Sequence, residues 1–193
     1  SMLAGEYTAP KAGDTIVDVC GAPGGKSINA ALKMSEQGDC GRVIARDLSD
    51  YKVALIDENI KRLNITNIQT QVYDALDCDE SLINKADIVI ADLPCSGLGI
   101  IGRKPDIKYN ASPEKLQSLV DLQRDILKVV SRYVKSGGVL MYSTCTINRA
   151  ENEDNADWIC KESGFTKDGE YHQLLPANNS GMDGFFVARL IKN

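Results

Sequence analysis

The sequence is poor in the residues from which zinc sites and hydrolase triads are built. It has a single histidine, His172, and 6 cysteines without a CxxC spacing. Because structural zinc sites are made from closely spaced cysteine and histidine, we expect neither zinc nor another bound metal. A Ser-His-Asp hydrolase has little scope with one histidine. We expect reduced thiols without disulfides, as is typical of a cytoplasmic protein.

Long apolar runs and an excess of basic residues are also missing. Residues 88–91 form one of the longest apolar runs, which is far shorter than a bilayer requires. No basic segment followed by an apolar stretch opens the chain, so we expect neither a membrane span nor a secretion signal. The net charge of −5 at pH 7 gives no sign of the basic surface that usually contacts nucleic-acid phosphates.

The pattern that is present is an alternation of short apolar runs and helical periodicity along the 193 residues. We predict strands at 15–19, 42–45, 68–72, 86–91, 138–143 and 185–191. We predict helices at 24–37, 50–63, 113–133 and 149–162, with Ser49 and Ser112 as N-caps. This alternation favours a doubly wound α/β fold, in which a parallel sheet carries helices on both faces. A single domain over residues 1–193 is expected.

A glycine-rich turn joins the first predicted strand to the first helix. It consists of Cys20, Gly21, Ala22, Pro23, Gly24, Gly25 and Lys26. Glycines let the backbone approach a ligand, toward which the first amides of the helix point. Lys26-Ser27 also matches the end of a phosphate-binding P-loop, with Asp92 as its magnesium-binding acid, although that motif needs glycine in place of Cys20. A turn that merely packs the helix on the strand is a third interpretation.

Acids follow the second and third predicted strands. Asp47 stands where a carboxylate can accept both ribose hydroxyls of an adenosyl ligand, and Asp74 where it can meet the adenine edge. A P-loop protein has no comparable need for either acid. As structural alternatives, Asp47 caps the helix after Ser49, and Asp74 is one solvated acid in a cluster with Asp77, Asp79 and Glu80.

Two cysteines follow the fourth and fifth predicted strands, Cys95 in 92–97 (DLPCSG) and Cys145 in 143–146 (STCT). If these strands are neighbours, both thiols emerge at one edge of the sheet. Residues 93–111 form a long irregular segment where ligands bind in such sheets. The remaining cysteines are interpreted as small buried apolar residues or as incidental: Cys20, Cys40, Cys78 and Cys160.

Three segments together resemble the signature of the RNA cytosine-5 methyltransferases, namely 21–26 (GAPGGK), 92–97 and 143–146. Segments 99–106 (GIIGRKPD), 151–153 (ENE) and 183–186 (DGFF) are similar to members that act on small-subunit ribosomal RNA. The resemblance covers nearly the whole chain. It implies a Rossmann-like class I methyltransferase with a mostly parallel, seven-stranded sheet and a late antiparallel strand. It also implies S-adenosyl-L-methionine as cofactor and small-subunit ribosomal RNA as partner; we expect a monomer.

The resemblance also implies roles for individual residues. Cys145 is the nucleophile that adds to cytosine C6, so that C5 can attack the sulfonium methyl group. Cys95 assists release of the methylated product. The residues alone leave these two roles open, because DNA cytosine-5 methyltransferases use the cysteine of a Pro-Cys motif as nucleophile. Asp92 and Lys26 match residues that contact the target base, where polar groups stabilise developing charge; their structural alternatives are a capping acid and a solvated lysine.

The basic stretch 103–108 is the candidate contact for RNA phosphates, with Arg103 preferred over the alternative of a solvated loop. Reaction at a ring carbon requires an unstacked base, so the target is a loop or a flipped nucleotide. The chain opens at Ser1-Met2 and reaches a strand by residue 15, so we expect a separate RNA-binding region in a longer protein. A non-catalytic RNA-binding or cofactor-binding module is the remaining alternative, against which the paired cysteines argue.

Calorimetry separates the methyltransferase and P-loop interpretations. We expect S-adenosylmethionine to bind and ATP with magnesium to give no binding heat, because Asp47 and Asp74 suit a ribose and an adenine rather than a triphosphate. The opposite pair of results would reverse the assignment.

Overall fold

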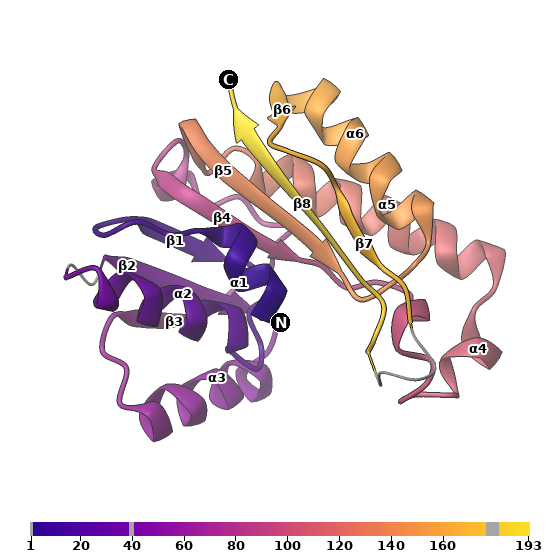
Figure 1. Cartoon of the computed structure of the whole chain (residues 1–193), viewed down its shortest axis with the longest axis horizontal. Helices are drawn as coiled ribbons and strands as arrows, with labels where there is room; N and C mark the ends of the chain where they lie inside the picture. Colours follow the sequence, from indigo (N-terminus) through magenta and orange to yellow (C-terminus); the bar gives the residue numbers. More distant parts are fainter. Residues whose placement is uncertain (1, 39–40, 177–181) are drawn as a thin grey trace.

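The computed structural model describes residues 2–38, 41–176 and 182–193, so Ser1 and Cys40 lie outside the described residues. Within these ranges the chain forms an eight-stranded sheet in the order β3-β2-β1-β4-β5-β8-β6, with β7 paired to β8 (Figure 1). The central strands pair in parallel: β1 (Thr15–Asp18), β2 (Arg42–Asp47), β3 (Ile68–Val72), β4 (Ala86–Asp92) and β5 (Val134–Thr144).

The late strand β8 (Phe185–Lys192) runs antiparallel to β5, β6 (Phe165–Lys167) and β7 (His172–Leu174). The predicted α/β fold with a late antiparallel strand is therefore confirmed. The described sheet has eight strands rather than the expected seven. Strands β6 and β7 have 3 residues each, which is too short to leave an alternating pattern in the sequence.

Helices cover both faces of the sheet. One face carries α1 (Met2–Thr8), α2 (Gly25–Glu36) and α3 (Asp50–Leu63), and the other carries α5 (Pro113–Val130) and α6 (Glu153–Ser163) (Figure 1). Successive strand residues serve opposite faces, since Ile16 packs in one buried cluster with Met34 of α2, and Val17 in the other with Leu127 of α5. Among the described residues, no helix is long and apolar enough to cross a membrane.

The predicted N-caps are in place, while α5 ends earlier than predicted. The Ser49 hydroxyl accepts from the amide of Lys52, and the Ser112 hydroxyl caps α5 ahead of Pro113. Helix α5 ends at Val130 instead of Tyr133, because the buried Tyr133 turns away to bond the 77–79 segment. Its hydroxyl accepts from the amide of Asp79 at 2.9 Å and donates to a carbonyl at 3.1 Å.

The last helix begins later than predicted. Residues Arg149–Glu151 form the 3-10 turn η3, and α6 starts only at Glu153. The reason lies in Asn152, which has a non-helical backbone with φ −108° and ψ −99°. Its buried side chain bonds the Thr144 hydroxyl, the Thr146 carbonyl and the Gln173 side chain. These bonds hold the start of α6 against the end of β5.

The segment predicted to be irregular, 93–111, contains the 3-10 turn η2 (Leu98–Ile100) and the short helix α4 (Ile107–Asn110). It is tied to two other segments through Gly99. The Gly99 amide donates to the carbonyl of Cys145 at 3.1 Å, and the Gly184 amide donates to the carbonyl of Gly99 at 2.7 Å. The loop after β4 is therefore fastened between the loop after β5 and the chain entering β8.

Replacing Gly99 tests this close packing. A Cβ at Gly99 would lie 2.6 Å from the carbonyl oxygen of Gly184 and 2.7 Å from that of Cys145. Because both neighbours are backbone, Gly99→Ala should lower the free energy of unfolding by about 1–3 kcal/mol and the Tm with it. Gly102→Ala is the control in the same loop, since a Cβ there meets nothing within 4 Å. Equal Tm values for the two variants in thermal melts would contradict the packing.

Candidate active site

A cavity of about 370 Å³ opens at the carboxyl ends of the parallel strands. The predicted site residues that line it stand at or just after the carboxyl ends of five strands: Cys20, Ala22, Asp47, Asp74, Asp92, Cys95 and Cys145. Other predicted site residues do not line this cavity: Gly21, Pro23, Gly24, Gly25, Lys26 and Arg103. We call this space the donor cavity. The sheet thus brings together acids and thiols that lie as far apart in sequence as Cys20 and Cys145.

The glycine turn shapes one end of the donor cavity. The Gly21 amide donates to the carbonyl of Arg46 at 2.7 Å, which ties the turn to the end of β2. Gly24 has a φ of 103°, and a Cβ there would press on Ile56 of α3 at 3.1 Å. By contrast, a Cβ on Gly25 would meet nothing within 4 Å. Gly24 is therefore required by the backbone, whereas Gly25 leaves open space at the start of α2.

Asp18 lies beneath this turn as a buried acid. The Ser27 hydroxyl donates to Asp18 Oδ2 at 2.7 Å, while Oδ1 has no partner among the described residues. Burial raises the pKa of Asp18 to about 6, against the lowering effects of Ser27 and Lys26. This buried oxygen can take a hydrogen bond from a water molecule.

Asp47 points into the donor cavity rather than capping α3. Its Oδ2 accepts from the amide of Ala22 at 3.0 Å, and its Oδ1 accepts from the amide of Leu48 at 2.8 Å and pairs with Lys52 at 3.0 Å. The N-cap of α3 is Ser49, so the structural alternative for Asp47 is wrong. Lys52 was not predicted from the sequence, since a lysine in the first turn of a helix resembles any solvated lysine.

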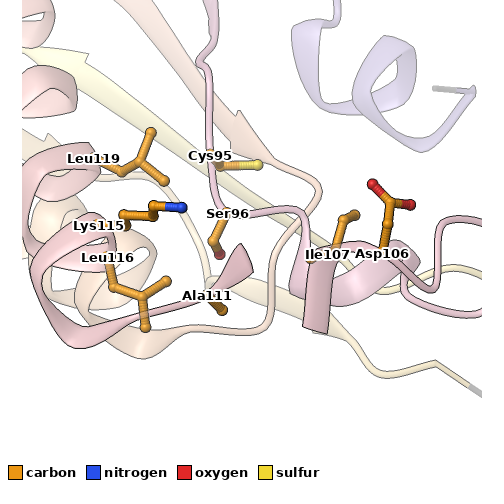
Figure 2. A pocket seen from close by; sticks show the side chains of 8 residues that line it. All are labelled: Cys95, Ser96, Asp106, Ile107, Ala111, Lys115, Leu116 and Leu119. Carbon is orange, nitrogen blue, oxygen red and sulfur yellow. The ribbon is translucent and has the colours of Figure 1, made fainter. Parts of the chain in front are cut away.

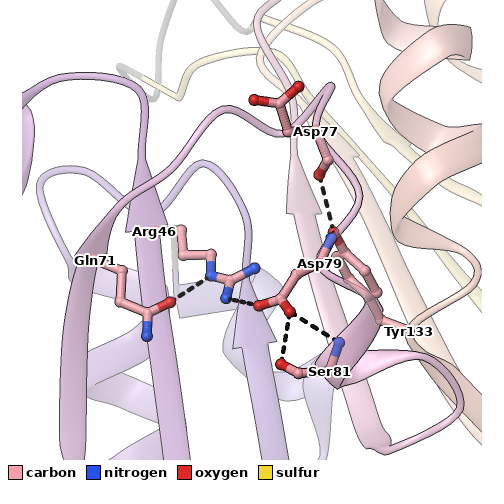
Figure 3. A network of polar contacts seen from close by, with 6 residues as sticks. All are labelled: Arg46, Gln71, Asp77, Asp79, Ser81 and Tyr133. Atoms are coloured by element: carbon pink, nitrogen blue, oxygen red, sulfur yellow. Dashed lines mark hydrogen bonds and ion pairs between the residues drawn. The ribbon is translucent and has the colours of Figure 1, made fainter.

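The far wall of the donor cavity is the segment after β3, which includes Tyr73 and Asp74. Asp74 accepts from the amide of Leu76 at 2.9 Å and is only partly exposed. A polar network around Arg46, which precedes Asp47 in β2 and points to the opposite face of the sheet, anchors the segment after β3 (Figure 3). In it Arg46 bonds Gln71 at 2.8 Å, pairs with Asp79, and stacks its guanidinium 4.2 Å from the centre of the Tyr73 ring. Asp79 is therefore a paired, structural acid and not part of a solvated cluster.

Asp92 connects the two thiol-bearing loops. It pairs with the ammonium group of Lys26, and its Oδ1 accepts from the Ser143 hydroxyl at 2.7 Å. Ser143 stands opposite Asp92 in the β4–β5 register. Lys26 is thus not a solvated lysine, and it does not line the donor cavity, because its ammonium group is paired with Asp92. Sequence reasoning missed Ser143, because a serine at the end of a strand carries no distinct signal.

The two cysteines meet at the rim of the donor cavity. The Sγ atoms of Cys95 and Cys145 lie 3.3 Å apart, which is hydrogen-bonding distance for thiols. A hydrogen bond from Cys95 lowers the pKa of the Cys145 thiol; burial and the charge of Asp92 oppose this, and the charge of Lys26 supports it. The same bond and burial raise the pKa of Cys95. The opposite directions of the two pKa shifts favour a thiolate on Cys145, with Cys95 as its protonated donor.

Cys95 also lines a second, smaller cavity of about 220 Å³ on the other side of its loop (Figure 2). This cavity lies between Ser96, the segment 106–111 and one side of α5, which contributes Lys115, Leu116 and Leu119. The Cys95 thiol is thus a wall shared by two spaces. The other described cysteines pack against the apolar core, as interpreted from the sequence: Cys20, Cys78 and Cys160.

Arg103 stands apart from both cavities. Its side chain is 70% exposed and pairs with Asp183 at 3.1 Å. The structure therefore places it on the surface of the loop after β4. Leu122 and Ile126 of α5, by contrast, line the donor cavity without having been predicted. Their spacing of four residues is identical to that of ordinary core positions, so no sequence signal could have separated them.

The donor cavity fits an adenosyl ligand by size and by chemistry. Its volume of about 370 Å³ falls within the range of roughly 300–1,000 Å³ that is usual for small-molecule sites. The Asp47 carboxylate can accept ribose hydroxyls beside the Ala22 amide, and Tyr73, Leu93 and Ile126 offer apolar surface to a purine ring. Among the described residues, no cluster of three metal-binding side chains occurs.

The open, mostly parallel sheet with this cavity at its strand ends defines a Rossmann-like class I methyltransferase, whose cofactor is S-adenosyl-L-methionine. Residues 6–191 match the model of the family described as 16S rRNA methyltransferase RsmB/F. The chain belongs to this family. Membership excludes the P-loop hydrolase considered from the sequence.

Curated relatives and solved structures agree with this placement. The chain is 37% identical over 211 residues to the probable ribosomal RNA small subunit methyltransferase B of Bacillus subtilis, covering 100% of this chain and 46% of the relative. The corresponding protein of Synechocystis is 35% identical, with 95% and 44% covered. A structure of NSun6 from Pyrococcus horikoshii with SFG matches at a TM-score of 0.85 and 27% identity over 99% of this chain and 51% of that one. The chain thus spans about half the length of these relatives.

Thiol alkylation tests the asymmetry of the cysteine pair. Iodoacetamide should modify Cys145 faster than Cys20 near pH 7, because the thiolate reacts and burial raises the pKa of Cys20 to about 12. Cys20 is a matched internal control, since it lines the same cavity. In Cys95→Ala, the pH at which Cys145 becomes reactive should shift upward because its hydrogen-bond donor is lost. The pH profile of alkylation is measured by mass spectrometry. An unchanged profile in Cys95→Ala would show that Cys95 does not stabilise the thiolate.

Proposed function

We propose that this chain transfers a methyl group from S-adenosylmethionine to C5 of a cytidine in small-subunit ribosomal RNA through a covalent cysteine adduct. One observation carries the proposal, namely that two thiols from neighbouring strands lie 3.3 Å apart at the rim of the donor cavity. The curated relatives from Bacillus subtilis and Synechocystis are named as probable methyltransferases of small-subunit ribosomal RNA, which supports ribosomal RNA as the substrate. A binding module would have no use for a thiolate and a thiol in contact at this place.

Cys145 is the proposed nucleophile. Its thiolate adds to C6 of the cytosine, a C6–S bond forms, and the electrons of the C5–C6 double bond move toward N3 and C5. Lys26 and Asp92, which are paired with each other, contact the base and stabilise the charge that develops there. When bound, S-adenosylmethionine would supply an electrophilic methyl group to the electron-rich C5, and its methyl–sulfur bond would break with the electron pair left on the sulfur as a neutral thioether.

Release of the product reverses the addition. A base, for which we assign Asp92 or a water molecule that it holds, removes the C5 proton. The electrons of the C5–H bond restore the C5–C6 double bond, and the C6–S bond breaks with its electron pair returning to Cys145. Cys95, placed 3.3 Å from the departing sulfur, donates its S–H to the thiolate as it leaves. The hydrogen bond that lowers the pKa of Cys145 before the reaction thus assists its departure afterwards.

Arg103 remains the proposed contact for RNA phosphates. Its exposed guanidinium lies on the loop after β4, and its ion pair with Asp183 is a surface pair that a phosphate can replace. The target base has to leave its stack to reach the thiols, because the reacting atoms lie at the rim of a cavity.

Two alanine variants separate the roles of the cysteines. Cys145→Ala should abolish both methyl transfer and the covalent adduct. Cys95→Ala should accumulate an RNA adduct that survives denaturing gels, with turnover reduced by about 10²-fold or more, because the departing thiolate loses its proton donor. Cys160→Ala, on α6 and outside both cavities, is the control and should behave as wild type. Wild-type turnover in both active-site variants would eliminate the covalent mechanism.

A further inference from the structure

Behind the Cys95 loop lies a fully buried carboxylate that the mechanism does not use. Glu151, in the turn η3, is 0% exposed and forms no salt bridge among the described residues. Its Oε2 accepts from the amide of Ser96 at 2.8 Å and from the Gln123 side chain at 3.0 Å, and its Oε1 accepts from Asn148 at 2.9 Å. The carboxylate is therefore held by three uncharged hydrogen-bond donors, and not by a cation.

Gln123 of α5 completes the arrangement from the other side. It too is 0% exposed. Its amide nitrogen donates to the carbonyl of Pro94 at 2.8 Å as well as to Glu151 at 3.0 Å. Its amide oxygen accepts from Asn155 of α6 at 2.8 Å, so the orientation of the amide is determined. Both hydrogen bonds of the amide nitrogen therefore serve the Cys95 loop, one directly through Pro94 and the other through Glu151.

We propose that Gln123 and Glu151 are positioning residues that clamp the two peptide groups flanking Cys95 and so keep its thiol against Cys145. Pro94 contributes the carbonyl before Cys95, and Ser96 the amide after it. A second tie joins the loops directly, since the hydroxyls of Ser96 and Thr146 lie 2.7 Å apart. The inference rests on the proposed function, because it concerns the release step assigned to Cys95.

Energetics argue that this network serves position and not stability. Buried polar side chains lose their hydration, and a well-packed apolar core of the same volume is often as stable or more so. A network in which each donor and acceptor is satisfied does, however, specify a unique geometry. The sulfur–sulfur contact of 3.3 Å is sensitive to such geometry, because a displacement of about 1 Å takes it beyond hydrogen-bonding distance.

The test variant is Gln123→Met, which keeps an unbranched side chain of similar length and removes the donor. The matched control is Gln117→Met on the same helix, where the exposed amide bonds only the side chain of Asp121 in the described structure. With labelled ribosomal RNA as substrate, we expect Gln123→Met to slow product release about tenfold and to raise the fraction of covalent adduct severalfold. The rate of adduct formation should change less, because no hydrogen bond of Gln123 reaches the Cys145 thiol itself.

Two further measurements keep the proposal decidable. Glu151→Gln retains an oxygen for the Ser96 amide and should release product nearly as fast as wild type, whereas Glu151→Ala should behave like Gln123→Met. In the absence of RNA, the pH at which Cys145 is alkylated should rise in Gln123→Met and stay unchanged in Gln117→Met. If Gln123→Met does not fold, Gln123→Asn, which withdraws the amide from Pro94 by one methylene group, replaces it in both assays.

Wild-type release and an unchanged alkylation profile in folded Gln123→Met would overturn the clamp. Equal slowing of adduct formation and release would also overturn it, because that result indicates general distortion of the site. Failure of Cys95→Ala to trap an adduct would count against the proposed function instead. In that event the alkylation profile alone decides whether Gln123 positions Cys95.

Discussion

The pairing of β4 with β5 is the constraint on which the site depends. These strands are parallel neighbours, and their register sets Asp92 opposite Ser143. Because parallel strands end at the same edge of a sheet, the loops that follow carry Cys95 and Cys145 out side by side. The sulfur contact, the Asp92–Ser143 hydrogen bond and the Gly99–Cys145 backbone bond all follow from this one alignment. A shift of one residue would turn each of these side chains to the other face.

Much of this arrangement was predictable from sequence, because it depends on local rules. The caps Ser49 and Ser112 follow from side-chain hydrogen bonding at helix starts, and the acids Asp47 and Asp92 from their places at strand ends. To predict that the two cysteines lie close together, it was enough to assume that the fourth and fifth strands are adjacent. The structure adds what local rules do not contain, namely the distance between the thiols.

The features that escaped prediction depend on contacts between distant residues. Leu122 lines the donor cavity with the spacing of a core leucine, and Arg46 is a buried arginine whose partners lie on other strands and turns. Strands β6 and β7 exist because β8 offers them a pairing edge, and nothing in their few residues requires it. The opposite pKa shifts of Cys95 and Cys145 belong to the same group, since hydrogen bonding and burial, and not residue type, make the two thiols unequal.

Arg46 joins the two ends of the donor cavity. Its backbone carbonyl receives the amide of Gly21, while its side chain lies against Tyr73 and bonds Gln71 and Asp79. The glycine turn and the segment after β3 are therefore built on one residue and keep a common frame. A ligand that enters finds its surroundings already assembled, so little ordering entropy opposes association and more of the contact free energy appears as affinity.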